Sequence, residues 1–139
     1  MSKLKFYPDV NTESLAGIYI HIPFCRQACH YCNFHFSTSL KYKDSLISAI
    51  CKEIKYQQSF FQNNELTSIY FGGGSPSLLN ENDLDLIFEA LSASFVWQKD
   101  IEITLEANPD DITKKMCDVW KKCGINRLSI GIQSFFEKD

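Results

Sequence analysis

Cys25, Cys29 and Cys32 lie within eight residues of one another, and their spacing, C-x3-C-x2-C, is typical of a metal-ligand set. Three thiolates on one short loop can hold three irons of a cuboidal 4Fe–4S cluster, which usually takes four cysteines, so one iron would stay open. Zinc is the alternative, with His30 or His35 as the fourth ligand, but the paired C-x2-C units of structural zinc sites are missing. The spacing therefore favours an iron–sulfur cluster over zinc.

The other three of the six cysteines, Cys51, Cys117 and Cys123, are scattered along the chain. A secreted disulfide scaffold would spread its cysteines as a framework and would carry an export signal. Residues 1–7 contain lysines, but no apolar segment follows them, and no later apolar run approaches the length that spans a membrane. The sequence therefore predicts a cytoplasmic protein without a membrane span.

The composition predicts one globular domain that does not bind nucleic acid. The 139 residues are 45% hydrophobic and 14% aromatic, which is enough apolar material for a core. Seventeen acidic residues outnumber fourteen basic ones, so the net charge is −3 and no overall positive field would attract a polyanion.

Short strand-like runs alternate with helix-like runs along the chain. Apolar residues recur at helical spacing after each run, with Asn80 and Asp83 as a capping pair and Asp110 as a further cap. The glycines at 72–74 are expected to end the second strand. The predicted elements are strands at 17–23, 66–71, 101–106 and 127–133, with helices at about 42–60, after Asn80, and from Asp110 to Gly124. This βαβαβαβ order predicts parallel strands joined by helical crossovers.

The third and fourth predicted strands are apolar on one face only. Ile101, Ile103 and Leu105 alternate with Glu102 and other polar residues, whereas parallel strands covered by helices on both sides usually read as continuous apolar runs. The pattern favours an α/β fold in which βα repeats form a partial, TIM-like barrel with a polar interior, and the alternative is a sheet with one solvated face. In such barrels the chemistry collects at the carboxyl ends of the strands.

The chain ends shortly after the fourth predicted strand, with too few strands to close a barrel. We expect a fragment truncated after about four strands, in which residues 1–16 lead into an incomplete core domain at 17–139.

Four segments resemble the radical S-adenosylmethionine (SAM) superfamily. The cysteine loop has the C-x3-C-x-aromatic-C signature, with Tyr31 as the aromatic residue. More narrowly, YIHIPFC at 19–25, FGGGSPS at 71–77, EANP at 106–109 and RLSIGIQSF at 127–135 resemble the branch that holds oxygen-independent coproporphyrinogen III oxidase and the heme chaperone HemW. The resemblance implies the fold of a radical SAM barrel, of which this chain is the first part.

The resemblance also implies the cofactors and the residues that hold them. Cys25, Cys29 and Cys32 would bind a 4Fe–4S cluster, whose open iron binds SAM before an electron from the cluster cleaves it. An electron donor such as flavodoxin or ferredoxin would be a partner. Ser75 stands where the family more often has threonine, and either hydroxyl can serve. The implied cofactor-binding residues are Tyr19, Tyr31, Gly73, Gly74, Ser75, Glu106 and Gln133.

Three functions remain open from the sequence. The position two residues after the third cysteine is a further cysteine in the oxidase, but it is Phe34 here, so the resemblance favours the chaperone branch, which binds and transfers heme. The second reading is an enzyme that decarboxylates coproporphyrinogen III by radical chemistry. The third is a zinc-binding module without radical chemistry.

Overall fold

The computed structural model describes residues 16–28, 36–60 and 65–136. Within these residues, β1 (Ala16–Ile22), β2 (Glu65–Gly73), β3 (Val96–Ala107) and β4 (Arg127–Ile130) form one sheet in the order β1-β2-β3-β4. All three neighbouring pairs are parallel. The crossovers contain α1 (Lys43–Gln57), α2 (Glu81–Ser94) and α3 (Lys114–Lys122). The predicted alternation of strands and helices is therefore confirmed.

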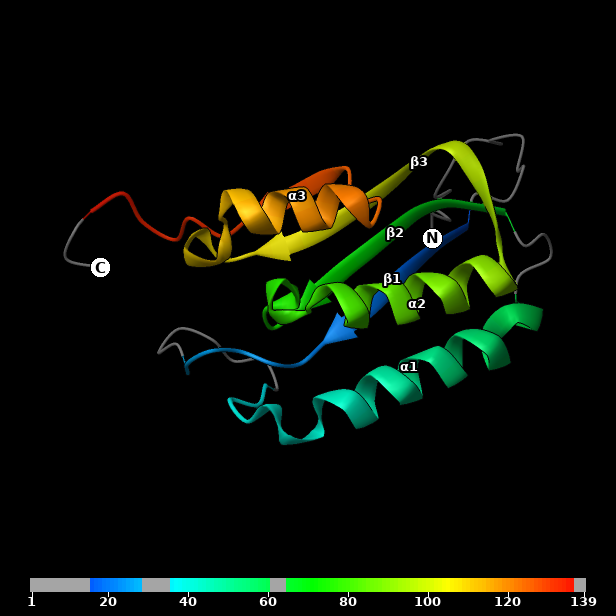
Figure 1. Ribbon diagram of the computed structural model, residues 1–139, viewed down its shortest axis with the longest axis horizontal. Helices are drawn as coiled ribbons and strands as arrows, with labels where there is room; N and C mark the ends of the chain where they lie inside the picture. Colours follow the sequence, from blue (N-terminus) through cyan, green and yellow to red (C-terminus); the bar gives the residue numbers. More distant parts are fainter. Residues whose placement is uncertain (1–15, 29–35, 61–64, 137–139) are drawn as a thin grey trace, which may run out of the picture.

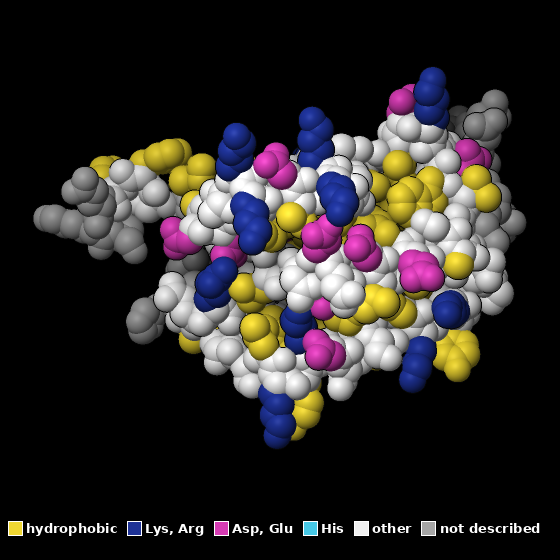
Figure 2. All heavy atoms as spheres, in the orientation of Figure 1, with side chains coloured by type: hydrophobic (Ala, Val, Ile, Leu, Met, Phe, Trp, Pro, Cys, Tyr) yellow, Lys and Arg dark blue, Asp and Glu magenta, His cyan; other side chains and the backbone are white. Residues whose placement is uncertain are grey.

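The three helices lie on one side of the sheet (Figure 1). The strand residues that point toward them alternate with residues that point away, as the two-residue period of a strand requires. A single core forms between sheet and helices; its fully buried members include Ile22, Ile47, Leu66, Ile69, Phe71, Leu84, Ile87, Leu91, Leu105 and Trp120. On the outer surface of the helices, basic and acidic side chains are interspersed (Figure 2).

Two helix ends were predicted correctly. The Asn80 side chain accepts a hydrogen bond from the Asp83 backbone N–H at 3.0 Å, and the Asp83 carboxylate accepts one from the Asn80 N–H at 2.9 Å. This reciprocal pair satisfies backbone donors at the start of α2. Gly124, with φ at +100°, follows the end of α3, where a residue without Cβ adopts this conformation at little cost.

The start of the third helix was predicted wrongly. Asp110 lies in a short 3-10 segment, η4 (Pro109–Asp111), and α3 begins only at Lys114. Thr113 is its cap, because the Thr113 hydroxyl accepts a hydrogen bond from the Met116 N–H at 3.2 Å. The helix is therefore shorter than the sequence suggested, and η4 is a separate segment before it.

The strand boundaries also differ from the prediction. Gly72 and Gly73 belong to β2, because pairing with His21 and Ile22 of β1 continues through them. The third strand begins five residues earlier than predicted, at Val96, while the fourth ends at Ile130 rather than at residue 133. The glycine segment is thus partly strand, and it carries the sheet directly into the turn that follows.

Among the helices of the described residues, none has both the length and the apolar character that a membrane span requires.

Candidate functional site

A cavity of about 490 Å³ opens at the carboxyl ends of the strands. This volume lies within the range of about 300–1,000 Å³ that is common for small-molecule sites. The cavity brings together residues that are up to 108 positions apart in the sequence; the predicted site residues in its lining are Cys25, Gly73, Gly74, Ser75, Glu106 and Gln133. Residues from the carboxyl ends of all four strands therefore line one cavity.

The base of the cysteine loop is fixed by backbone hydrogen bonds. The Cys25 N–H donates to the Ser37 carbonyl at 3.0 Å, and the Ser37 N–H donates to the Pro23 carbonyl at 2.8 Å. Phe24 and Ser37 form an isolated parallel bridge. The described beginning and end of the loop are thus held side by side. Cys29, Tyr31 and Cys32 lie outside the described residues.

The glycine segment lies directly against the first cysteine. The Gly74 N–H donates to the Ile22 carbonyl and the Ser75 N–H to the Phe24 carbonyl, both at 2.7 Å, which extends the pairing of β1 with β2. A Cβ added to Gly74 would lie 2.9 Å from Cys25 Sγ and 2.6 Å from the Phe24 carbonyl oxygen. Only glycine at position 74 permits this approach of backbone to thiol.

Gly73 has a separate reason to be glycine. Its φ is +113°, a conformation that other residues rarely adopt. A Cβ at this position would lie 2.6 Å from the His21 ring. The turn out of β2 therefore depends on both the conformation and the small size of this residue.

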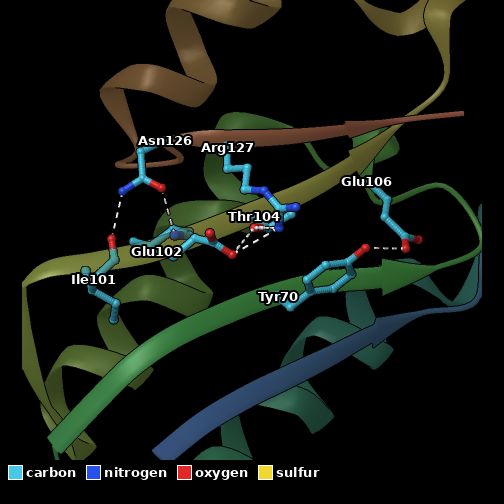
Figure 3. A network of polar contacts seen from close by, with 8 residues as sticks. Tyr70, Ile101, Glu102, Thr104, Glu106, Asn126 and Arg127 are labelled. Carbon is cyan, nitrogen blue, oxygen red and sulfur yellow. Dashed lines mark hydrogen bonds and ion pairs between the residues drawn. The ribbon is translucent and has the colours of Figure 1, made fainter. Parts of the chain in front are cut away.

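Glu106 lies half-buried near the end of β3, and its carboxylate accepts hydrogen bonds from two residues, of which Figure 3 shows Tyr70. The Tyr70 hydroxyl donates to Oε1 at 2.7 Å, and the Gly73 N–H donates to Oε2 at 3.1 Å. The hydrogen bond between Tyr70 and Glu106 is the main cause that raises the pKa of Tyr70, because it stabilises the protonated phenol beside a carboxylate. The arrangement orients one carboxylate at the cavity wall.

Tyr19 lies near this group but outside the cavity lining. Its ring stacks on Tyr70, with centroids 5.8 Å apart, and the residue as a whole is 58% exposed. Burial of part of the ring and the negative charge of Glu106 both raise the pKa of Tyr19. The structure thus places Tyr19 in β1 and Glu106 in β3, on the same face of the sheet and separated by Tyr70 of β2.

Ser75 and Gln133 complete the predicted set. Ser75 is buried, and its hydroxyl accepts a hydrogen bond from the Asn108 side-chain amide at 2.9 Å. Gln133 follows β4, is exposed, and lines the cavity. Ser75 therefore has a structural partner in the segment after β3, while Gln133 borders the cavity from the segment after β4.

Sequence reasoning missed several residues at this end of the sheet. Arg26 also lines the cavity, and its Nε donates to Asp111 Oδ1 at 2.7 Å. Ser77 donates to the other oxygen of Asp111 at 2.6 Å. Arg26 directly follows a candidate ligand, which could have drawn attention to it. Asp111, by contrast, stands next to Asp110, which the sequence favoured as a helix cap, and Tyr70 resembles an ordinary strand residue.

A second polar group lies farther down the same face, toward the start of the strands (Figure 3). Arg127 lies 3.1 Å from Glu102 Oε1 and donates to Thr104 Oγ1 at 3.3 Å. The Thr104 hydroxyl donates to Glu102 at 3.1 Å. The face opposite the helices is therefore polar along β3, as the sequence alternation predicted.

The chain matches the radical SAM superfamily over residues 19–138, and it belongs to that family. Its relatives include the heme chaperone HemW of Escherichia coli (strain K12), 36% identical over 125 residues that cover 88% of this chain and 33% of HemW. Another is the oxygen-independent coproporphyrinogen III oxidase of Salmonella typhimurium (strain LT2), 32% identical over 88% of this chain and 27% of that protein. The chain thus spans about a third or less of the length of these relatives.

A solved structure confirms the fold. Coproporphyrinogen III oxidase (HemN) from Escherichia coli, a radical SAM enzyme, matches with a TM-score of 0.80 and 30% sequence identity, over 88% of this chain and 29% of that one. The predicted fold, a partial βα barrel of the radical SAM type, is therefore correct. Membership of the family implies a 4Fe–4S cluster and SAM as cofactors.

Proposed function

We propose that the cavity at the carboxyl ends of the strands binds SAM beside a 4Fe–4S cluster held by Cys25, Cys29 and Cys32. The observation that carries this proposal is the meeting of a cysteine thiol, an open glycine backbone and an oriented carboxylate in one cavity. A bound cluster and SAM supply one-electron chemistry that begins at the sulfonium. In this proposal, residues 17–139 form the first part of a radical SAM core and residues 1–16 lead into it.

The described residues fit these cofactors. Cys25 offers a soft thiolate ligand, which iron–sulfur clusters require. Gly73 and Gly74 lack a Cβ, so the main chain of the glycine segment packs directly against Cys25 and His21 at the cavity wall, where its carbonyl groups would bind polar groups of a ligand. The Glu106 carboxylate, oriented by Tyr70 and Gly73, would bind a hydroxyl or ammonium group of SAM.

The other residues that we propose to contact SAM are assigned from their positions in the fold or the sequence. Ser75 and Gln133 line the same cavity and would bind polar groups of SAM. Tyr19 and Tyr31 would pack beside the cofactor. Tyr19 stacks on Tyr70, and Tyr70 in turn donates a hydrogen bond to Glu106. An electron-donor protein such as flavodoxin or ferredoxin would reduce the cluster.

The cluster proposal is tested by anaerobic reconstitution of the chain with iron and sulfide. We expect a brown protein containing about four irons per chain, and loss of that colour in Cys25→Ser and Cys29→Ala. Cys123→Ser is the matched control, because burial and nearby acidic groups raise the pKa of the Cys123 thiol and disfavour the thiolate. Zinc bound by air-free protein without iron, or a full cluster in either loop variant, would contradict the proposal.

Within the family, we propose a HemW-like role in which the protein binds and transfers heme. Phe34 supports this role, because the fourth cysteine of the oxidase signature is missing at that position. Relatives named HemW, with identities of 36% and 38%, support it as well. Heme titration followed by visible absorption tests this role, and we expect saturable binding at one heme per chain.

Decarboxylation of coproporphyrinogen III is the second candidate. Structural similarity to coproporphyrinogen III oxidase, with a TM-score of 0.80, favours it. Anaerobic incubation of the reconstituted protein with coproporphyrinogen III, SAM and a reductant distinguishes the two. Release of carbon dioxide in proportion to SAM consumed would support the oxidase, whereas heme binding without decarboxylation would support the chaperone.

A further inference from the structure

Asp111 is a buried carboxylate just beyond the end of β3, and both of its oxygens are occupied by side chains from other segments. The Arg26 guanidinium donates to Oδ1 through Nε at 2.7 Å, and a second guanidinium nitrogen lies 2.5 Å from the same oxygen. The Ser77 hydroxyl donates to Oδ2 at 2.6 Å. Only 5% of Asp111 is exposed.

The partners of Asp111 come from the two segments that form the proposed cofactor site. Arg26 directly follows Cys25 in the cysteine loop, and Ser77 lies in η3 (Pro76–Leu78), two residues after Ser75. The Asn108 amide reinforces the connection by donating to Ser75. Three loops at the carboxyl ends of β1, β2 and β3 are therefore tied to one another through η4.

The loss of stability on breaking this connection depends on how deeply the Asp111 carboxylate is buried. A carboxylate buried with two partners has lost its water, so removal of the cation leaves a charge that is poorly compensated. The Arg26 side chain is itself 64% exposed and lines the cavity, so its position is set by Asp111 at the guanidinium end and by the Cys25 backbone at the other.

We propose that Asp111 is a positioning residue for the Cys25 thiol: by holding Arg26 and Ser77 together, it fixes the cysteine loop against the glycine segment. This inference rests on the proposed function, because it assigns Asp111 to the support of a cluster ligand. Groups that orient a metal ligand without touching the metal commonly change metal affinity by about 10–100-fold when mutated.

The molecule contains a second ion pair that serves as a control. Lys43 at the start of α1 is paired with Asp83 of α2, and Asp83 is as buried as Asp111. This pair joins two helices and contributes no residue to the cavity lining. Loss of Lys43 should therefore destabilise the fold in the same way as loss of Arg26, without disturbing the cysteine loop.

The test compares Arg26→Gln with Lys43→Gln after reconstitution of the full chain with iron and sulfide. We expect both variants to unfold at lower urea concentration than the unchanged protein. We expect only Arg26→Gln to lose iron to a chelator about tenfold faster and to show an altered visible circular dichroism spectrum of the cluster. Asp111→Asn should reproduce the effect of Arg26→Gln, and Arg26→Lys should restore part of the cluster lifetime.

Equal rates of iron loss in Arg26→Gln, Asp111→Asn and Lys43→Gln would overturn this inference while leaving the cluster itself established. Failure of the unchanged protein to take up a cluster would instead overturn the proposed function, and the positioning role with it. Faster iron loss in both arginine and lysine variants, in proportion to their lost stability, would show a purely structural role for Asp111 and would contradict the proposal.

Discussion

The two faces of the sheet are built from alternate residues of the same strands, yet they differ in almost every property. On the helix side, Ile69, Phe71 and Leu105 are fully buried in a continuous apolar core. On the opposite side, Tyr70 and Glu106, their neighbours in sequence, form hydrogen bonds at the edge of a cavity. A shift of one residue in the chain separates the two environments.

This division shows how the fold can hold a polar candidate site without a large cost in stability. The apolar face supplies most of the burial, so the polar face can carry carboxylates, tyrosines and bare glycine backbone. The two faces meet at the carboxyl ends of the strands, where the polar residues border the cavity. The comparison predicts that substitutions on the helix face change stability, and that substitutions on the cavity face change ligand binding.

Phe71→Ala should have the largest effect on stability. Phe71 is fully buried and packs edge-on against Phe88, with ring centroids 5.6 Å apart. Its truncation should lower the free energy of unfolding by about 3–5 kcal/mol, because apolar contacts are lost and a cavity remains. Urea denaturation measures this loss. Tyr19→Ala on the opposite face is the control, with an expected loss of under about 1 kcal/mol, because Tyr19 is mostly exposed. Comparable losses would show that the two faces are not energetically distinct.

Gly73→Ala should have the next largest effect on stability, at the end of β2 beside the cavity. An alanine with φ near +113° costs about 1–3 kcal/mol, and its Cβ would also displace the His21 ring. Gly124→Ala is the matched control, since φ there is +100° but the nearest heavy atom to an added Cβ is 3.9 Å away. We expect a loss of about 1–2 kcal/mol for Gly124→Ala, from the backbone conformation alone. Equal losses in urea denaturation would mean that crowding by His21 is unimportant.

The fold was predictable because its signals are local and repeated. Alternating apolar residues located all four strands, and the Asn80 and Asp83 pair located the start of α2. The errors fell at boundaries where distant contacts decide the outcome. Gly72 is strand because His21 of β1 pairs with it, and Asp110 is not a helix cap because residues 109–111 form η4, in which Asp111 binds Arg26 and Ser77.

The candidate site was predictable to the extent that its residues belong to motifs. Resemblance to a family selected Cys25, the glycine segment and Glu106, which the structure brings to one cavity. Tyr70 and Asp111 could not be found in this way, since their importance comes from partners 36 and 85 residues away in the sequence. Such pairings depend on strand register and on the shape of short turns, which a single sequence does not reveal.

Tyr70→Phe should have the smallest effect, and its pH dependence sharpens the comparison. The variant keeps the ring that stacks on Tyr19 but loses the hydrogen bond to Glu106, at a cost of about 1 kcal/mol near neutral pH. The hydrogen bond to Glu106 raises the pKa of Tyr70 above its ordinary value of 10.0. Because the folded state holds this proton more tightly than the unfolded state, the contribution is complete below about pH 10 and declines as the pH rises through the raised pKa.

The stability difference between the unchanged protein and Tyr70→Phe should therefore be constant from pH 7 to about 9 and shrink above pH 10, as followed by urea denaturation. Glu106→Gln removes the negative charge that is part of the cause, so in that background the difference should depend much less on pH. If the unchanged protein and Tyr70→Phe instead unfold at the same urea concentration at every pH, Tyr70 contributes through its ring alone. Glu106 would then be oriented at the cavity by the Gly73 N–H without help from the neighbouring strand residue.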